Sequence, residues 1–451
     1  MAGVQGVAEE LNPAIIGGGY AGMAAAVELA RRGIPVTVFE SAKQLGGRAR
    51  GVSYNDTQLD NGQHLLLGCY HDTLRLIELV GGNIAQDFLR LPLQLDLHGH
   101  FTLRAPKLPA PLHLLVALMR ADGLTWNERL MAARFMLAMR SNAFTLPSHA
   151  FEGGTGGEGK DCTVLELLRA YGQDANLTLK LWEPLTLAAL NTPIAQASAQ
   201  VLLNVLRDSL NQARADSDML LPRLDFTALF PQRAARFVEQ RGGMVHLSCG
   251  VEHITPIEGG FELETALGVQ RYSHVICATS PVVTARLLST IPELAETVVQ
   301  IEALEHQPIY TVYLQYPADV ILPHAMLGLH QRVSQWLFDK GRISGQHGLI
   351  ASVISAEGLH QQLGQDELVH KVIAELRVEF GIVQAPLWYK VIAEKRATFC
   401  CAPNLKRPSQ RTALTGLYLA GDYTAGDYPA TLEGAVRSGL HCAELCLPER
   451  K

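Results

Sequence analysis

The stretch from Ala14 to Glu40 constrains the fold of this chain more than any other part of its sequence. Its residues, AIIGGGYAGMAAAVELARRGIPVTVFE, predict a short strand, a glycine turn, a helix and a second strand. Gly17, Gly19 and Gly22 follow the G-x-G-x-x-G spacing, which permits the turn, close approach to a pyrophosphate and tight helix packing. Glu40 ends the second strand about 20 residues later, where an acid accepts a hydrogen bond from a ribose hydroxyl. The sequence therefore predicts a dinucleotide site that favours FAD or NAD over NADP.

The residues around this unit agree with the same interpretation. Segment 21–32 is rich in alanine and suits a helix, whose free N-terminal amides would form an anion site. Gly33 stands where that helix should end. Pro13 cannot donate to a strand ladder, so we expect the first strand to begin at this residue. The alternative, an accidental glycine turn, would leave the agreement of all these signals unexplained.

Length and composition limit the remaining possibilities. The chain has 451 residues, too many for one ordinary core, so we expect at least two domains. It is 48% hydrophobic and 18% charged, which indicates either a large core or apolar surface that faces a lipid. A net charge of -6 and a pI of about 6.2 do not favour a nucleic-acid partner.

Cysteine usage and hydropathy indicate the compartment. The eight cysteines include no C-x-x-C pair, so we expect buried free thiols in a reducing compartment and no metal site. The N-terminus has neither the basic start nor the apolar core of a signal peptide. No apolar run reaches the roughly 18 to 20 residues of a membrane span. We expect a cytoplasmic protein, with peripheral attachment to the inner face of the cell membrane left open.

A second motif, Leu45-Gly46-Gly47-Arg48, follows the first unit closely. Its glycines allow close backbone approach to a ligand, and its arginine brings a fixed cation toward a phosphate or a ring edge. A surface turn with a solvated arginine is the plain alternative. Together, the two motifs resemble the superfamily of flavin-dependent amine oxidases and carotenoid desaturases, in which Gly-Gly-Arg contacts FAD.

A third motif, DNGQHLLLG, covers residues 60–68. A lone histidine is usually structural, and a lone aspartate is usually a turn residue. The motif nevertheless resembles a narrower group, the squalene-associated FAD-dependent desaturases, also called hydroxysqualene dehydroxylases. That resemblance implies that Gly62 lies beside the flavin and makes Asp60 and His64 candidate catalytic residues by position.

The last motif joins Gly421 and Asp422 to the segment YPATLEGAVRSG at residues 428–439. An acid after a strand can hold a ribityl hydroxyl, and a helix starting near Thr431 can place its positive end beside the flavin N1–C2=O locus. An ordinary strand, loop and helix with an Asx turn would explain the same residues. Together with the resemblance, these motifs imply FAD contacts at Gly17, Gly19, Tyr20, Ala21, Gly22, Glu40, Ser41, Gly47, Arg48, Gly62, Gln63, His64, Val251, Gly421, Asp422, Thr431, Leu432, Glu433 and Ala435.

The middle of the chain carries no nucleotide motif. Segments 112–117 and 130–139 predict apolar helices, and the methionines and arginines of the second suit a core, a lipid tunnel or a membrane surface. Residues 152–160 predict a flexible loop, either a lid or a surface insertion. Further helices are predicted at 181–210, 226–240 and 367–380, and strands at 308–316, 336–340 and 349–355. Where the narrow group has WLFDR, this chain has Lys340, to which we assign no role.

These observations predict an α/β protein with a Rossmann-like FAD-binding domain of the amine-oxidase or glutathione-reductase type. Residues 1–85, 222–300 and 396–451 would form this domain, and residues 86–221 and 301–395 an inserted substrate domain with a mixed sheet and helices.

The resemblance implies reduction of hydroxysqualene to squalene in squalene and hopanoid synthesis. The substrate would be a C30 isoprenoid, and NAD(P)H or a reductase would bind transiently as the electron donor. Two alternatives remain: a carotenoid-type desaturase or oxidase acting on another polyene or an amine, and a non-catalytic isoprenoid carrier. The complete set of flavin motifs argues against the carrier. Reaction direction, proton donor, electron donor and oligomeric state are left open.

Overall fold

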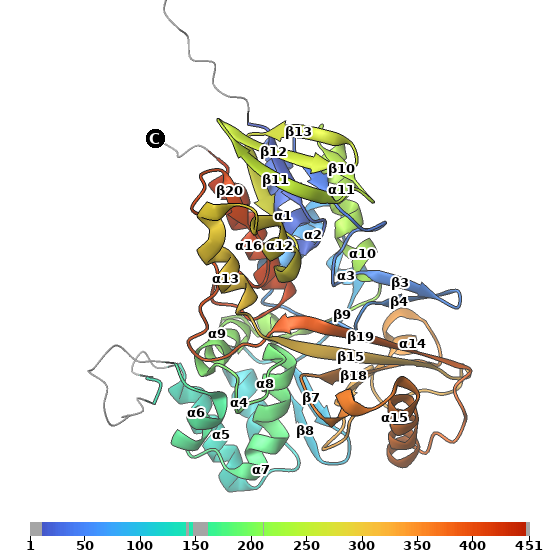
Figure 1. The fold of residues 1–451 in the computed structure, drawn as a ribbon. Helices are drawn as coiled ribbons and strands as arrows, with labels where there is room; N and C mark the ends of the chain where they lie inside the picture. Colours follow the sequence, from blue (N-terminus) through green and yellow to red (C-terminus); the bar gives the residue numbers. More distant parts are fainter. Residues whose placement is uncertain (1–10, 141–143, 148–160, 211, 448–451) are drawn as a thin grey trace, which may run out of the picture.

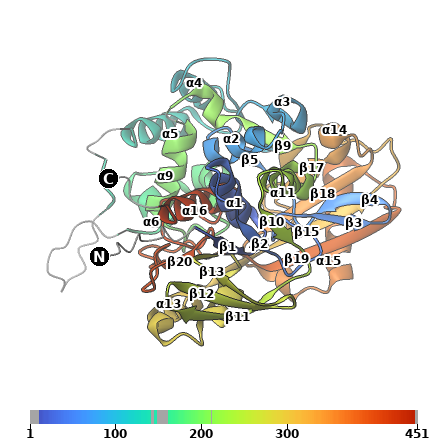
Figure 2. The same ribbon diagram turned by 90° about the horizontal axis from the view of Figure 1, so that it is seen from above.

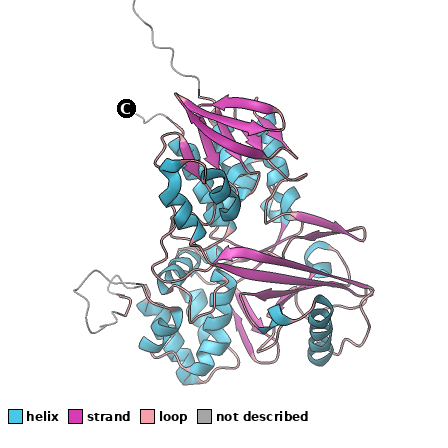
Figure 3. Cartoon of the chain, in the orientation of Figure 1, coloured by secondary structure: helices cyan, strands magenta, loops and turns pink. Residues whose placement is uncertain are grey.

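A computed structural model describes residues 11–140, 144–147, 161–210 and 212–447 (Figure 1). One part of the molecule is built around a five-stranded parallel sheet, and the other around a seven-stranded mixed sheet with a group of helices beside it (Figure 3). The glycine-rich loop predicted at residues 152–160 lies outside the described residues. Within the described residues, no helix is both long and apolar enough to cross a membrane.

The parallel sheet is assembled from distant segments of the chain. Its strand order is β10-β2-β1-β14-β20, and all its neighbouring strands are parallel. The strands are β1 (Pro13–Ile16), β2 (Thr37–Phe39), β10 (Met244–His246), β14 (His274–Cys277) and β20 (Leu417–Leu419). The central strand begins at Pro13, as predicted, because proline is tolerated where no ladder hydrogen bond is required of it.

Layers cover the two faces of this sheet (Figure 2). Helix α1 (Tyr20–Arg31) packs between α11 (Pro231–Glu239) and α16 (Leu432–Leu445) on one face. The antiparallel strands β11 (Val251–Ile257), β12 (Gly260–Thr265) and β13 (Gly268–Tyr272) lie on the other face, with α12 (Pro281–Leu288) and α13 (Ala295–Glu302) beside them. This is the strand–turn–helix–strand unit that the sequence predicts.

The mixed sheet has the strand order β19-β15-β18-β17-β16-β7-β8. Its strands are β7 (Gln94–Leu97), β8 (Phe101–Arg104), β15 (His306–Gln315), β16 (Met326–Gly328), β17 (Trp336–Asp339), β18 (Leu349–Ser355) and β19 (Trp388–Phe399). Two insertions therefore build one sheet, joined by the parallel pair Gly328 and Leu97. Helix α15 (Gln365–Phe380) covers its outer face through a buried cluster that includes Val312 and Leu376.

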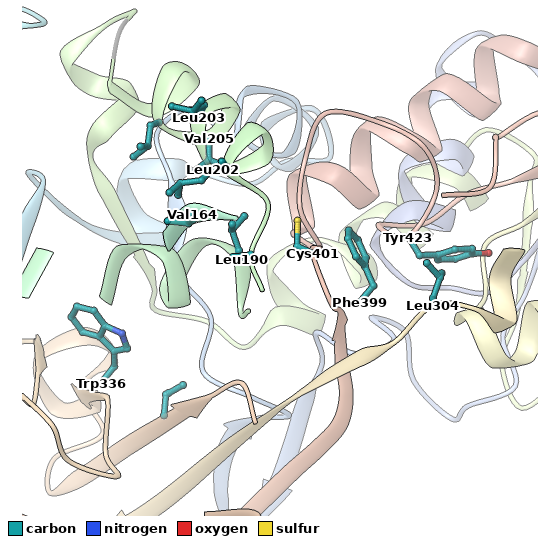
Figure 4. Close-up of a cluster of buried hydrophobic side chains, with 14 of the residues drawn as sticks. Val164, Leu190, Leu202, Leu203, Val205, Leu304, Trp336, Phe399, Cys401 and Tyr423 are labelled. Atoms are coloured by element: carbon teal, nitrogen blue, oxygen red, sulfur yellow. The ribbon is translucent and has the colours of Figure 1, made fainter. Parts of the chain in front are cut away.

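A group of helices lies beside the mixed sheet. It contains α4 (Leu112–Met119), α5 (Trp126–Ala138), α6 (Val164–Ala170), α7 (Ala175–Leu177), a π-helical turn (Thr178–Trp182), α8 (Glu183–Leu190), α9 (Ala199–Leu210) and a 3-10 turn (Arg214–Ser217). Thr125 and Glu128 form a capping box that starts α5. Buried side chains of this group, among them Val164, Leu190 and Leu202, pack in one cluster with Trp336 of the sheet (Figure 4).

The remaining elements are short. They are β3 (Gly51–Tyr54), β4 (Thr57–Asp60), β5 (Leu66–Leu67), α2 (His71–Leu79), α3 (Ile84–Asp87), β6 (Phe88–Leu91), β9 (Met219–Pro222), α10 (Phe226–Leu229), the 3-10 turns at Pro292–Leu294 and Leu359–Gln362, and α14 (Lys340–Ser344). The small antiparallel sheet β5-β9-β6 pairs residues 66–67 and 88–91 with residues 219–222.

Two predicted elements differ from the structure, whereas the cysteines are as predicted. The single helix predicted at 226–240 is two helices, α10 and α11, because Pro231 has no amide with which to continue α10. The strand predicted at 336–340 ends at Asp339, whose side chain accepts a hydrogen bond from the Arg342 amide and starts α14. All eight cysteines are free and buried, as predicted.

Candidate functional site

A cavity of about 680 Å³ extends between the two parts of the molecule. At one end it is lined by the glycine turn after β1 and by the ends of the parallel strands. At the other end it is lined by the mixed sheet and the helical group. In open α/β sheets, ligands bind at the carboxyl ends of the strands, which is where the first end of the cavity lies.

The glycine turn has two kinds of glycine. A Cβ atom on Gly17 would lie 2.6 Å from the Ala278 carbonyl oxygen, and one on Gly22 would lie 2.0 Å from the Gly17 carbonyl oxygen. These two positions require glycine for packing. A Cβ atom on Gly19 would meet no atom closer than the Gly47 Cα at 4.0 Å. The space beside Gly19 is therefore open to the cavity, and only a small residue keeps it open.

This open space suits the pyrophosphate of a dinucleotide. Among the described residues, no side chain caps the start of α1, so its first amides remain available to an anion. The Gly46 amide donates to the Gly18 carbonyl oxygen at 2.9 Å, which places the Gly-Gly-Arg motif against the glycine turn. The residues present therefore fit FAD at this end, because the glycine turn leaves open space beside Gly19 and the first amides of α1 are free to donate to a pyrophosphate.

Glu40 lies beside the glycine turn, at the end of β2. Its carboxylate accepts hydrogen bonds from the amides of Gly18 at 2.8 Å and Ala42 at 2.7 Å, and it is largely buried. Ser41 and Val251 line the cavity next to it. This corner therefore presents a fixed acceptor beside an apolar wall, which is the chemistry that an adenosine needs.

Arg48 and Asp422 meet although 374 residues separate them in the chain. The Arg48 Nη2 atom lies 2.5 Å from Asp422 Oδ1, and Nη1 donates to the Ala397 carbonyl oxygen at 2.7 Å. Both residues line the cavity, as does Thr431, which caps α16 by accepting from the Gly434 amide at 3.1 Å. The N- and C-terminal motifs thus form one wall.

The turn at residues 60–64 rests on a buried charged cluster. Asp60 accepts from the Phe226 amide at 2.9 Å, and burial raises the pKa of Asp60 to about 6, although the positive charge of Lys340 acts in the opposite direction. The Lys340 Nζ atom donates to Gln63 Oε1 at 3.2 Å, and Gln63 Nε2 donates to the His64 carbonyl oxygen at 3.0 Å. Asp60 and Lys340 therefore stand behind the turn and hold it in place.

His64 faces the cavity as a neutral ring. Its Nδ1 atom lies 2.6 Å from the Gly62 carbonyl oxygen, which can only accept, so Nδ1 carries the proton. Its ring centroid lies 4.8 Å from that of Phe226, and burial lowers the pKa of His64. The Nε2 atom is then left as a hydrogen-bond acceptor.

The structure brings most of the predicted site residues together and leaves three outside the cavity wall. Gly22 packs α1, and Asp60 lies behind the turn. Glu433 is fully buried and accepts from the Thr73 amide at 3.0 Å and its hydroxyl at 2.7 Å, so it caps α2 and faces away from the cavity. The others line the cavity: Gly17, Gly19, Tyr20, Ala21, Glu40, Ser41, Gly47, Arg48, Gly62, Gln63, His64, Val251, Gly421, Asp422, Thr431, Leu432 and Ala435.

The far end of the cavity is apolar, and only Met136 of its residues belongs to a segment, 130–139, for which the sequence indicated a lipid tunnel as one interpretation. Helices α4, α5, α8 and α9, the π-helical turn, β9 and the mixed sheet contribute Leu114, Leu118, Met136, Leu181, Trp182, Leu185, Leu202, Leu206, Leu210, Met219, Met326, Trp336, Phe338 and Val353. Their only signal is the apolar periodicity that every core residue shares.

One cross-strand row of the mixed sheet adds polar groups to this wall. Ile309 pairs with Glu394 on one side and with Ser355 on the other, and all three line the cavity. Glu394 thus brings a carboxylate to the cavity wall. It stands in an alternating strand, where a single acid predicts only a solvated face.

The fold and the site define an FAD-dependent oxidoreductase. Residues 20–447 match the family of flavin containing amine oxidoreductases, and the chain belongs to that family. The FAD prediction is thereby confirmed, and so is the resemblance seen in the sequence.

Individual relatives agree with this assignment. The chain is 28% identical to the hydroxysqualene dehydroxylase of Rhodopseudomonas palustris, over 96% of this chain and 97% of the relative. It is 24% identical to the zeta-carotene desaturase of Arabidopsis thaliana, over 95% of this chain and 84% of the relative. Among solved structures, cyclohexylamine oxidase from Brevibacterium oxydans has a TM-score of 0.66 at 17% identity, covering 97% of this chain and 98% of that one.

Proposed function

We propose that this oxidoreductase reduces hydroxysqualene to squalene, as a step of squalene and hopanoid synthesis. The observation that carries the proposal is the cavity itself, which runs from the glycine turn to an end walled by aliphatic and aromatic side chains. A long C30 isoprenoid with one hydroxyl suits an apolar pocket with few polar groups at one end. The similarity to hydroxysqualene dehydroxylases over nearly the whole chain supports the same substrate.

The proposed FAD-binding and substrate-binding segments correspond to the two sheets. We retain as a proposal that residues 1–85, 222–300 and 396–451 bind FAD and that residues 86–221 and 301–395 bind substrate. The strands of the parallel sheet all come from the first set, and those of the mixed sheet come almost wholly from the second. Strand β19 runs through the boundary at 395–396.

Residues of both end motifs would hold the cofactor. Gly19 and the start of α1 would take the pyrophosphate, Glu40 the adenosine ribose, and Arg48, Asp422 and the start of α16 the flavin half. When bound in its reduced form, FAD supplies a hydride. The electrons would reach it from NAD(P)H or a reductase that binds transiently.

The chain itself must exclude water, orient the alcohol and supply a proton to the departing hydroxyl. The apolar wall excludes water. The Nε2 atom of neutral His64 can accept a hydrogen bond from the substrate hydroxyl and so orient it. Asp60 is assigned a positioning role, since it lies behind the turn.

A desaturase acting on another polyene is the second candidate. The similarity to zeta-carotene desaturase favours it, and the same apolar cavity would accommodate such a hydrocarbon. The dehydroxylation would oxidise the reduced flavin, whereas a desaturation would reduce the oxidised flavin. A non-catalytic carrier is disfavoured, because the glycine turn keeps an open space that a carrier would not need.

The direction can be tested with purified holoprotein under anaerobic conditions. The flavin is photoreduced and hydroxysqualene is added, while flavin absorbance is followed and the lipid is analysed. Reoxidation with formation of squalene supports the proposal. A flavin that stays reduced with hydroxysqualene, but whose oxidised form is reduced by a polyene hydrocarbon, would assign the desaturase reaction instead.

A further inference from the structure

The helices α4 and α5 are apolar on both sides. Their inner sides line the cavity through Leu114, Leu118 and Met136. On the outer side of α5, Trp126 is 65% exposed and Leu137 is 48% exposed. A helix at the surface of a globular protein normally presents polar residues to solvent. The outer side of this helix pair therefore lacks the composition of an ordinary solvated surface.

The exposed apolar residues of α5 form one stripe, and two further exposed leucines lie before and at the start of α4. Trp126, Leu130 and Leu137 are spaced by four and seven residues, which places them on one face of the helix. The two helices are consecutive and packed together, since Arg129 Nη1 donates to the Met119 carbonyl oxygen at 3.0 Å. We call this surface the hairpin face and define it by Leu108, Leu112, Trp126, Leu130 and Leu137.

Positive charge surrounds the hairpin face. Lys107, Arg120 and Arg134 are exposed on the same two helices and their flanks. Of the acids there, Asp122 is exposed between the helices, and Glu128 is buried in the capping box, so the exposed charge is positive on balance. The Arg129 guanidinium lies 4.9 Å from the Trp126 ring centroid. The chain as a whole has a net charge of -6, so this basic surface stands out against an acidic protein. An anionic membrane would attract this side and repel the rest.

We propose that the hairpin face docks the protein on an anionic lipid bilayer. Trp126 and the leucines would enter the boundary between headgroups and acyl chains, where an amphipathic Trp side chain is favoured, and the basic residues would meet the lipid phosphates. Because the opposite sides of the same helices line the cavity, an apolar substrate could pass from the bilayer to the cavity without crossing water. This last step rests on the proposed function, but docking itself does not.

Other exposed apolar residues serve as a comparison. Val378 is 72% exposed and Leu387 is 69% exposed, near the C-terminal end of α15 and the start of β19. Neither lines the cavity. They match the hairpin face in exposure and differ in position, and so provide matched controls.

The test is co-sedimentation of purified holoprotein with vesicles, without substrate. We expect binding to vesicles of phosphatidylcholine and phosphatidylglycerol in equal parts, and weaker binding to pure phosphatidylcholine or in high salt. The double substitution Trp126→Glu and Leu130→Glu should lower the bound fraction about tenfold or more, since it removes two exposed apolar groups that would enter the bilayer. The double substitution Val378→Glu and Leu387→Glu should leave binding unchanged.

Controls separate docking from folding and from the reaction. The hairpin variant should keep its FAD absorbance, its melting temperature and its turnover of detergent-dispersed substrate, because neither residue lines the cavity. Equal sedimentation of the hairpin variant and the wild type would overturn the proposal. The proposal would also be overturned if the wild-type protein did not bind the vesicles. A wild-type dimer that dissociates in the Trp126→Glu variant would overturn it as well, because the hairpin face would then bind a second copy of the chain. If a protein that still binds vesicles did not convert hydroxysqualene, the proposed reaction would be contradicted and the proposed docking would stand.

Discussion

The two ends of the cavity are formed by different chemical groups. The glycine-turn end is made by backbone atoms and a few fixed polar groups, such as Glu40 and the pair of Arg48 and Asp422. The apolar end is made by many side chains of similar kind from separate helices and strands. A backbone site tolerates few residues at each position, whereas an apolar wall tolerates many, because volume and hydrophobicity matter more than identity.

The largest effect is expected from Gly22→Ala. The added Cβ atom would lie 2.0 Å from the Gly17 carbonyl oxygen, so α1 must move away from β1. We expect little folded protein and no retained flavin, measured by circular dichroism and absorbance. By contrast, Gly19→Ala has 4.0 Å of room and should fold normally but bind FAD poorly, since the new methyl group fills the pyrophosphate space. Equal behaviour of the two variants would contradict the distinction between packing and binding glycines.

The next largest effect concerns the buried cluster behind the turn. Lys340→Met leaves the Asp60 carboxyl group buried without its cation, and we expect a loss of about 3 kcal/mol in stability, measured by denaturant unfolding. The double substitution Asp60→Asn and Lys340→Met should recover part of it. If the double variant were no more stable than Lys340→Met, the two residues would not be coupled.

The same variant has a defined pH dependence. Burial raises the pKa of Asp60 from its ordinary value to about 6 in the folded protein. The free energy of unfolding therefore falls as the pH rises from the pKa of the unfolded chain to the pKa of the folded protein. Without Lys340 this pKa should rise further. The destabilisation of Lys340→Met should therefore be small near pH 5 and larger at pH 7.5. A constant difference between the melting temperatures of variant and wild type across this range would refute the linkage.

Glu40→Ala should weaken FAD binding by about tenfold to a hundredfold, because a charged acceptor for a ribose hydroxyl is lost. The protein should still fold, because Glu40 lines the cavity and water can replace its carboxylate at the amides of Gly18 and Ala42. Flavin retention on gel filtration measures the effect. Glu433→Gln is the matched control, because Glu433 faces α2 and should affect stability more than flavin content. Unchanged flavin retention in Glu40→Ala would remove Glu40 from the site.

His64→Ala should lower turnover by about tenfold without unfolding the protein, since it removes one acceptor beside the substrate. Flavin content and melting temperature should stay near the wild-type values. Full activity would exclude His64 from the reaction, and parallel loss of flavin would give it a cofactor role instead.

The smallest effect is expected at the apolar end. Met136→Leu conserves volume in a wall of similar residues, so turnover should stay within about twofold and stability within about 1.5 kcal/mol. Steady-state kinetics and thermal unfolding measure both. A large loss of activity would show that this wall is as specific as the glycine turn.

The motifs could be found from the sequence because each reports a local backbone requirement. The start of β1 at Pro13, helix α1 and the end of β2 at Glu40 follow from glycine spacing, propensity and periodicity. The sequence carried no signal where a distant neighbour decides a side chain's direction. The Glu433 carboxylate is held by the amides at the start of α2, and no local pattern around Glu433 indicates this contact.

Taken alone, the sequence determined the α/β class, the nucleotide end of the cavity and the flavin family, because these depend on residues close together in the chain. Only the tertiary structure decided that Lys340 stands behind the turn at Gln63, that Arg48 reaches Asp422 and that Glu394 faces the cavity. These contacts join segments hundreds of residues apart, and no local pattern encodes them. The same holds for the hairpin face, since the sequence indicated apolar helices, but only their packing shows which side remains exposed.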